Sequence, residues 1–160
     1  MASTAALARA LILAVLLAST SGVAAEEKPR WFADIGDVGA HAKWGIPETD
    51  AVGFEVECVE DARVKIRPAL FAMEEPDALP DIRFSVDGEP YVRSAHLDYS
   101  ELDGAWQASA VLSKNDALVD AMRRGSELTY DFTPPLREGD AFTISLSGSA
   151  KAIDAALDGC

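Results

Sequence analysis

The chain has 160 residues, 49% of them hydrophobic, and carries 27 acidic side chains against 14 Lys and Arg, a formal net charge of −13. This length provides one ordinary domain whose core can fold without a structural metal. The acidic excess argues against binding to nucleic acid phosphates or to an anionic lipid surface, because like charges repel there. It is compatible with a cationic partner, although high net charge is first of all a property of soluble proteins.

Residues 1–25 have the order of a cleaved secretory signal peptide. A short, weakly cationic start contains Arg9, an uninterrupted apolar run covers 10–18, and small residues precede Glu26. The apolar run is much shorter than the ~20 residues of a membrane-spanning helix, so we expect cleavage and no span in the mature chain. The mature protein is predicted to be 26–160, a single domain in the periplasm or outside the cell.

Cys58 and Cys160 are the only cysteines, and both lie in the predicted mature chain. Two thiols without a competitor are expected to pair in an oxidising compartment, so Cys58–Cys160 is a predicted disulfide. The bridge would tie the tail to the interior and contribute roughly 4–5 kcal/mol in the chain-entropy model. A reactive or lipid-carrying cysteine fits less well, because the chain lacks both a Cys-x-x-Cys pair and a Leu-x-x-Cys before the cleavage point.

Residues 31–50 contain three glycines, a proline and no regular hydrophobic period. This pattern predicts an irregular entry segment. Trp31, Phe32 and Trp44 are expected to dock the segment on the core, because aromatic side chains bury large apolar areas. The alternative is that these aromatics line a binding groove.

Apolar and charged residues alternate over 52–58 and again over 64–67, the period-2 pattern of half-buried strands. A turn centred at Asp61 would bring opposite charges together on the solvent face and Val56 against Ile66 on the other. A shift of one residue would mix the two faces. The predicted pairs on the solvent face are Glu57 with Lys65 and Glu55 with Arg67.

The rest of the chain continues as short strands with two short helices. Expected are a loop over 69–80, strands at 82–86 and 91–95 around the turn Asp87-Gly88, a strand at 106–112, a helix starting after Ser113 and ending at Gly125, strands at 128–132 and 142–146, and a helix over 150–158. Such an order predicts a mainly β fold, an antiparallel sandwich or partly open barrel with two short helices, as one disulfide-stapled domain.

Catalytic and metal chemistry have little support in the sequence. Only His41 and His96 could serve as the base of a nucleophilic triad, and no serine lies in a Gly-x-Ser-x-Gly turn. Candidate orienting acids are Asp34, Asp37 and Asp98. No His-x-x-x-His pair is present, and both cysteines are expected in the disulfide. We therefore predict no catalytic residue, no cofactor-binding residue and no metal ligand.

Paired carboxylates leave a carboxylate-dependent hydrolase open as an alternative function. With 27 acidic residues, however, some pair is expected at a glycosidase-like separation by chance. The proline-rich loop holds a local acidic cluster of Glu74, Glu75, Asp77 and Asp81. A calcium loop would need Asp-x-Asp-x-Asp-Gly spacing, which this cluster lacks, so a solvated acidic loop is the better interpretation.

The C-terminal pattern resembles the ending of small secreted proteins from alphaproteobacteria. Among these, it is similar to the invasion-associated locus B family. The residues that carry the resemblance are Phe142, Ile144, Leu146, Gly148, Ala152, Ile153, Leu157 and Cys160, with similar stretches at 54–58 and 121–128. The resemblance implies a periplasmic or surface β-rich protein without established catalysis, linked to host interaction or envelope upkeep. It assigns no functional residue.

The prediction for function is a non-catalytic binding module in the periplasm or outside the cell. Its acidic surface or an exposed aromatic rim would hold a protein or cell-envelope partner. One specific version is an inhibitor of a cationic hydrolase such as a lysozyme, because charge complementarity speeds encounter. The alternatives are the hydrolase and a structural envelope component. No oligomeric state is predicted.

Overall fold

The computed structural model describes residues 27–36, 39–60, 62–69, 71–135, 141–158 and 160, and the predicted signal peptide lies outside them. In chain order the elements are β1 (Arg30–Gly36), β2 (Gly39–Gly45), β3 (Val52–Val59), β4 (Arg63–Pro68), β5 (Phe71–Ala72), β6 (Asp81–Val86), β7 (Glu89–Ser94), β8 (His96–Ser100), β9 (Ala105–Ser113), α1 (Ala117–Arg124), β10 (Glu127–Thr133), β11 (Phe142–Ser145) and α2 (Ser149–Leu157). Neither helix of this described part has the length and hydropathy to cross a bilayer.

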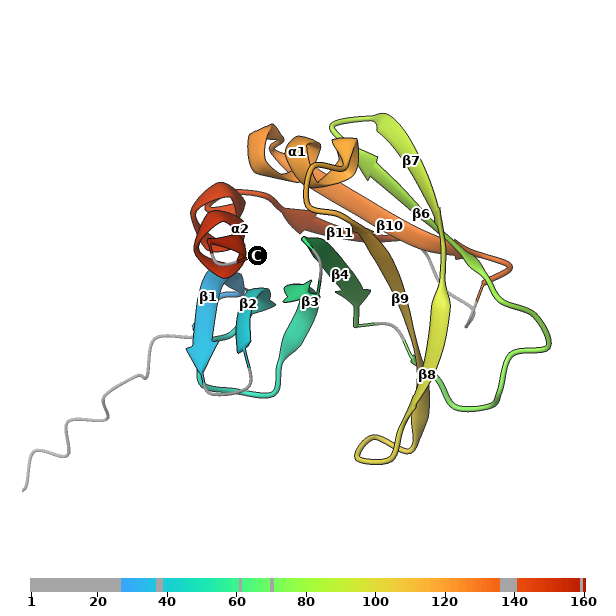
Figure 1. Ribbon diagram of the computed structural model, residues 1–160. Helices are drawn as coiled ribbons and strands as arrows, with labels where there is room; N and C mark the ends of the chain where they lie inside the picture. The colour runs from blue at the N-terminus through green and yellow to red at the C-terminus, as the bar shows by residue number, and fades with distance from the viewer. Residues whose placement is uncertain (1–26, 37–38, 61, 70, 136–140, 159) are drawn as a thin grey trace, which may run out of the picture.

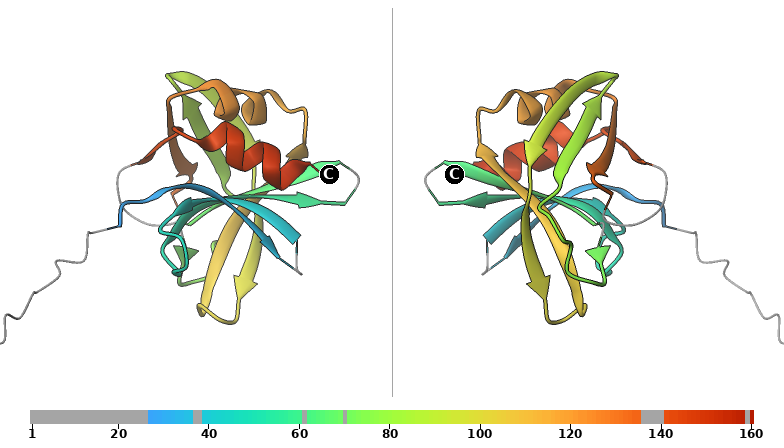
Figure 2. Two further views of the ribbon diagram at one scale, coloured as in Figure 1. Left: turned by 90° about the vertical axis from the view of Figure 1, so that its left-hand side faces the viewer. Right: turned by 90° about the vertical axis from the view of Figure 1, so that its right-hand side faces the viewer.

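The strands form two antiparallel sheets, as the mainly β prediction requires (Figure 1). The larger sheet has the order β1-β2-β3-β4-β9-β5, with β8 also paired to β9, and the smaller has the order β11-β10-β6-β7. Helix α2 packs against β1 and β2 of the larger sheet and against α1. In the side views the two sheets cross over a shared core, and both helices lie at one end of the molecule (Figure 2).

A single buried residue joins β7 of the smaller sheet to β8 of the larger one. This residue is Ala95, and its backbone N–H donates to the carbonyl oxygen of Pro80 at 3.0 Å. Pro90 lies in β7, which is an edge strand, as expected for a residue that cannot donate to a ladder. The chain therefore turns from one sheet into the other without a long connection.

Aromatic side chains fill the space between the sheets. The ring of Phe54 contacts Trp31, Phe84 and Tyr130, with ring centroids 5.4–6.3 Å apart. The Tyr130 hydroxyl donates to the carbonyl oxygen of Gly53 at 2.9 Å, so it links the smaller sheet to β3. The Trp31 indole Nε1–H donates to a β11 carbonyl oxygen at 2.7 Å, and it links β1 to the other sheet in the same way. Burial of these polar tips is thus compensated by hydrogen bonds.

The predicted disulfide is present. Cys58 near the end of β3 is bonded to Cys160, with 5.6 Å between their Cα atoms and a sequence separation of 102. Lys114 donates from Nζ to the carbonyl oxygen of Cys160, so the tail is held by a hydrogen bond as well. The bridge fastens the chain after α2 to the β3–β4 hairpin.

The prediction of an irregular segment over 31–50 is wrong, because β1 and β2 pair along their whole length there. Gly36 pairs with Gly39 at the end of the two strands, and Gly45 lies at the register shift between β2 and β3. A Cβ atom on Gly45 would lie 2.2 Å from a backbone oxygen, so this glycine permits close approach of the chains. The glycines therefore mark strand ends.

The burial of the N-terminal aromatic residues and the start of α1 were also predicted from the sequence. Trp31 is buried in the core as predicted, whereas Phe32 is only half-buried. Helix α1 begins later than expected: Ser113 ends β9, and Asp116 is the N-cap, its carboxylate accepting from the backbone N–H of Leu118 at 2.8 Å. An Asp at the N-cap accepts this bond readily, which explains the later start.

Candidate functional site

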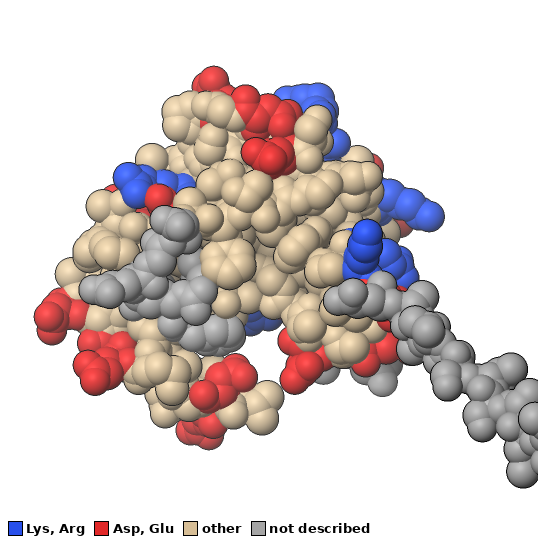
Figure 3. All heavy atoms as spheres, turned by 180° about the vertical axis from the view of Figure 1, so that it is seen from behind, with Lys and Arg blue, Asp and Glu red and all other residues tan. Residues whose placement is uncertain are grey.

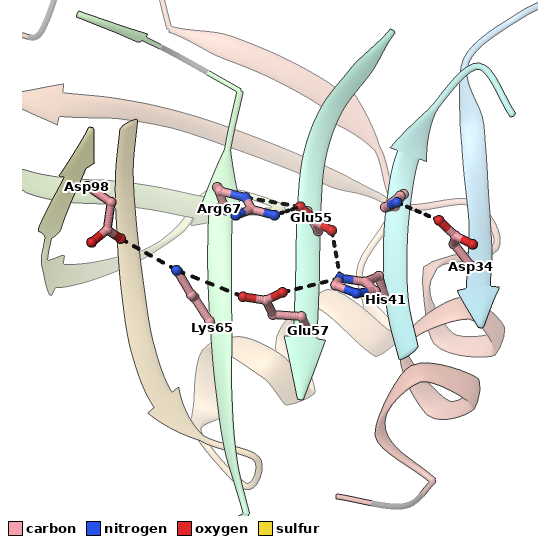
Figure 4. Close-up of polar contacts among 8 residues, drawn as sticks. Asp34, His41, Glu55, Glu57, Lys65, Arg67 and Asp98 are labelled. Carbon is pink, nitrogen blue, oxygen red and sulfur yellow. Dashed lines mark hydrogen bonds and ion pairs between the residues drawn. The ribbon is translucent and has the colours of Figure 1, made fainter. Parts of the chain in front are cut away.

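One face of the larger sheet carries a row of ionisable side chains that runs across β1, β2, β3, β4 and β8 (Figure 4). Alternate residues of a strand point to the same face, so each strand contributes one or two charges to the row. Acids and bases alternate from strand to strand through the first four strands. The members are Asp34, His41, Lys43, Glu55, Glu57, Lys65, Arg67 and Asp98.

Glu55 is the most buried member of the row, with 7% of its surface exposed. Its Oε2 accepts from Arg67 Nε at 3.0 Å and from a second guanidinium N–H, and its Oε1 lies 2.7 Å from His41 Nδ1. A buried carboxylate is costly without charged hydrogen-bond donors. Arg67 therefore compensates the charge of Glu55, as the predicted cross-strand pair implied.

Glu57 has a similar two-sided environment one step along β3. Its Oε2 lies 3.2 Å from His41 Nδ1, and its Oε1 lies 3.9 Å from Lys65 Nζ. Lys65 also lies 3.5 Å from a carboxylate oxygen of Asp98, which extends the row to β8. Each glutamate thus turns one oxygen to a cation on β4 and the other oxygen to the imidazole on β2.

His41 Nδ1 is a buried ring atom with no well-aligned hydrogen bond to any described residue, although both carboxylates are close. His41 Nδ1, one Glu55 oxygen and one Glu57 oxygen all lie within 4.8 Å of one another. Nitrogen and carboxylate oxygens in such a group are a ligand set that divalent transition metals accept. This trio is the candidate metal-binding group of the described chain.

This trio was not predicted from the sequence, because β2 was not predicted to be a strand. Its members meet because β2 pairs with β3, with His41 opposite Glu57. The alternation of His41 and Lys43 with buried Ala42 was the available signal for a strand at this place. Without a strand at this place, the contact of His41 with Glu55 and Glu57 could not be predicted.

A salt bridge ends the row at β1, where Lys43 Nζ lies 2.6 Å from Asp34 Oδ2. The hydrogen bond and the positive charge of Lys43 lower the pKa of Asp34 below its usual value. A hollow of about 490 Å³ beside it is lined by Phe32, Asp34 and Glu48 among others. A general acid in a hydrolase needs a raised pKa, so Asp34 is poorly suited to that role.

A second hollow, called here the acidic cleft, opens beside Glu55 and has a volume of about 370 Å³. Glu55 and Arg67 contribute to its lining from the sheet, Asp50 from the connection between β2 and β3, and Asp103 from the turn between β8 and β9. The remaining lining residues are Val52, Ala69, Ser100 and Gln107. Ser100 Oγ donates to Asp103 Oδ2 at 2.6 Å. Two acidic turns thus flank a compensated ion pair.

The other candidate residues predicted from the sequence do not join the row of side chains on the larger sheet, or they form no group of potential metal ligands. His96 is exposed in β8, and Asp37 lies outside the described residues. Glu74, Glu75 and Asp77 line a hollow of about 330 Å³ with Pro134 and Pro135, and Asp81 accepts from Ser94 Oγ at 3.1 Å. The trio of His41, Glu55 and Glu57 is the group of potential metal ligands found in the described part of the chain.

Comparison with known proteins gives no relative. No family model, no curated protein and no solved structure matches this chain. The resemblance to the invasion-associated locus B family therefore remains a prediction, and what the site can do follows from its geometry alone.

Proposed function

We propose that the protein is a non-catalytic binding module, in the periplasm or outside the cell, whose acidic cleft takes a basic side chain of a partner protein. The observation that carries the proposal is that Asp50 and Asp103 line one hollow from two different turns. Neither carboxylate has a Lys or Arg partner within the described chain. An arginine or lysine of a partner would supply the missing charge.

The charge distribution supports a basic partner. Because Arg67 compensates Glu55 inside the cleft, the net negative charge there comes from Asp50 and Asp103. Acidic side chains gather along the lower part of Figure 3, on both sides of a hollow in the surface. With a net charge of −13 for the chain, this field would attract a cationic protein and raise its association rate.

The size of the cleft limits its occupant. Pockets for small ligands usually have volumes of about 300–1,000 Å³, and a cleft of about 370 Å³ is at the lower end of that range. This space suits one long side chain better than an extended glycan. A cationic hydrolase such as a lysozyme, which presents arginines and lysines on its surface, is the partner class we propose.

A charge-matched pair of variants tests the proposal. The variant Asp50→Asn/Asp103→Asn removes two charges from the cleft, and Glu89→Gln/Glu127→Gln removes two exposed charges from β7 and β10. Binding to a basic lysozyme is measured by titration calorimetry at low and high NaCl concentration, with a chelator present. We expect the cleft variant to bind about tenfold more weakly and the control to lose no more than about threefold, through the long-range field alone.

Two results would contradict the proposed function. Equal losses in the two variants would mean that net charge, and no particular site, attracts the basic protein. Absent or salt-independent binding by the unmodified chain would remove the cationic partner altogether, because an interaction between exposed charges weakens as salt screens them.

A further inference from the structure

We infer that His41, Glu55 and Glu57 form a binding site for one divalent transition-metal ion, and that Zn²⁺ suits it best. This inference goes beyond the proposed function, because it concerns the β2–β3 side of Glu55 and needs no partner protein. The three side chains project from two neighbouring strands toward one point on the sheet face (Figure 4).

The spacing of the ligand atoms is near that of a zinc site. Zn–N and Zn–O distances of about 2.0–2.2 Å in a tetrahedron place ligand atoms about 3.4 Å apart. His41 Nδ1 lies 2.7 Å from the Glu55 oxygen and 3.2 Å from the Glu57 oxygen, and all three atoms are within 4.8 Å. Side-chain movements that widen the 2.7 Å contact by about 0.7 Å would admit the ion, and water would complete the tetrahedron.

The second observation is the direction of the imidazole. His41 Nδ1 is buried and close to two carboxylate oxygens, yet it lacks a well-aligned hydrogen bond within the described chain. A ring nitrogen that points between two oxygens is poorly placed to donate to either one. It is well placed to coordinate an ion that both oxygens also bind.

Neighbouring cations hold the glutamates in the required orientation. Arg67 binds Oε2 of Glu55, and Lys65 lies near Oε1 of Glu57, so the opposite oxygen of each carboxylate is turned to His41. Outer hydrogen bonds of this kind orient the ligands of many metal sites. The same two cations repel the ion, so we expect weaker binding than at a zinc site without cationic neighbours.

Metal binding exchanges a proton for the ion. Without a metal, a nitrogen lone pair 2.7 Å from a carboxylate oxygen would be repelled, so Nδ1 carries a proton. On binding, the N–H bond of Nδ1 breaks and the N–metal bond forms. The proton passes to Nε2, or to solvent if the ring begins as imidazolium, and no electron is transferred.

The ligand types also select among ions. Calcium requires six to eight oxygen ligands, whereas this group offers one nitrogen and two carboxylates. Both cysteines are bonded to each other and offer no thiolate. Zinc accepts three protein ligands from nitrogen and oxygen with water in the fourth position, so it matches the group.

The test uses the full mature chain without a histidine tag, freed of metal with a chelator. Zinc is titrated by calorimetry up to ~100 µM, a range that covers micromolar affinity. We expect one ion per chain, with affinity at least about tenfold weaker for His41→Ala and Glu57→Gln because each loses one of three ligands. The matched control is His96→Ala, which removes the only other histidine and should leave the affinity unchanged.

A spectroscopic measurement on the unmodified chain covers the case in which a variant fails to fold. In ¹H–¹⁵N spectra of the imidazoles, Zn²⁺ should shift the Nδ1 signal of His41 and leave the signals of His96 in place. No saturable binding, binding that His41→Ala leaves intact, or a shift confined to His96 would each overturn the inference. Lysozyme binding is measured with chelator present, so loss of one activity is distinguishable from loss of the other.

Discussion

The buried ion pair of Glu55 and Arg67 gives the sharpest prediction for stability. The substitution Arg67→Met keeps the long apolar stem and removes the guanidinium that donates to Glu55. It leaves a carboxylate that is 7% exposed with only the His41 contact. Because water can replace the lost donors only in part at this position, the folded state should lose stability.

The magnitude follows from the degree of burial. Removing one partner of a fully buried pair costs about 3–5 kcal/mol. The Arg67 side chain is 28% exposed, so water partly screens the pair, and His41 still offers a polar contact. We therefore expect Arg67→Met to lower the free energy of unfolding by about 2–3 kcal/mol. The double variant Glu55→Gln/Arg67→Met should recover most of this loss, to within about 1 kcal/mol of the unmodified protein.

Urea unfolding with the disulfide intact, followed by tryptophan fluorescence, measures these values. The matched control is Arg83→Met. Arg83 makes two bonds of 2.6–2.7 Å to Asp131 on the smaller sheet, but its side chain is 54% exposed. Exposed ion pairs contribute little, so the control should lose much less stability than Arg67→Met. Equal losses for the two Arg variants, or no recovery in the double variant, would refute the burial argument.

Three further predictions concern other contacts of the fold. Replacing Cys58 and Cys160 by Ser opens a loop of 102 residues and should lower the free energy of unfolding by up to about 4–5 kcal/mol; a loss below about 1 kcal/mol in urea unfolding would contradict the stapling role. Trp31→Phe removes the indole donor to the β11 carbonyl and should cost about 1–3 kcal/mol in the same assay, whereas an unchanged midpoint would mean that water satisfies that carbonyl. Lys43→Met should raise the pKa of Asp34 in an NMR titration, because the lowered pKa comes from the hydrogen bond and charge of Lys43. Since the folded-state pKa lies below the ordinary value, the small stabilisation by this pair is present above that value and is lost as pH falls through the folded-state pKa.

The β3–β4 hairpin shows how far the sequence alone can specify structure. The structure pairs Glu57 with Lys65 and Glu55 with Arg67, as predicted. The prediction succeeded because both strands alternate apolar and charged residues. Only a few registers keep the apolar side chains of such strands on one face and the charged ones on the other. The order of charges then favours one of those registers.

The β1–β2 hairpin shows why the rest was missed. Its strands contain little alternation of large apolar and polar residues, because β1 is mostly exposed and β2 contributes the small Ala42 to the core. Strand β2 pairs with β1 on one side and with β3 on the other, and these pairings are not visible in its own residue pattern. The trio of His41, Glu55 and Glu57 depends on the pairing of β2 with β3. Its chemistry was therefore hidden together with the unpredicted strand, although every residue type was visible.

The position of the disulfide has a practical consequence for binding assays. Val52 at the start of β3 lines the acidic cleft, and Cys58 near the other end of that strand holds residue 160. Six residues of extended chain separate the two points by about 20 Å. A biosensor chip, dye or carrier attached through the backbone of residue 160 would therefore lie about 20 Å from the cleft. Attachment through lysines at random would not ensure this separation.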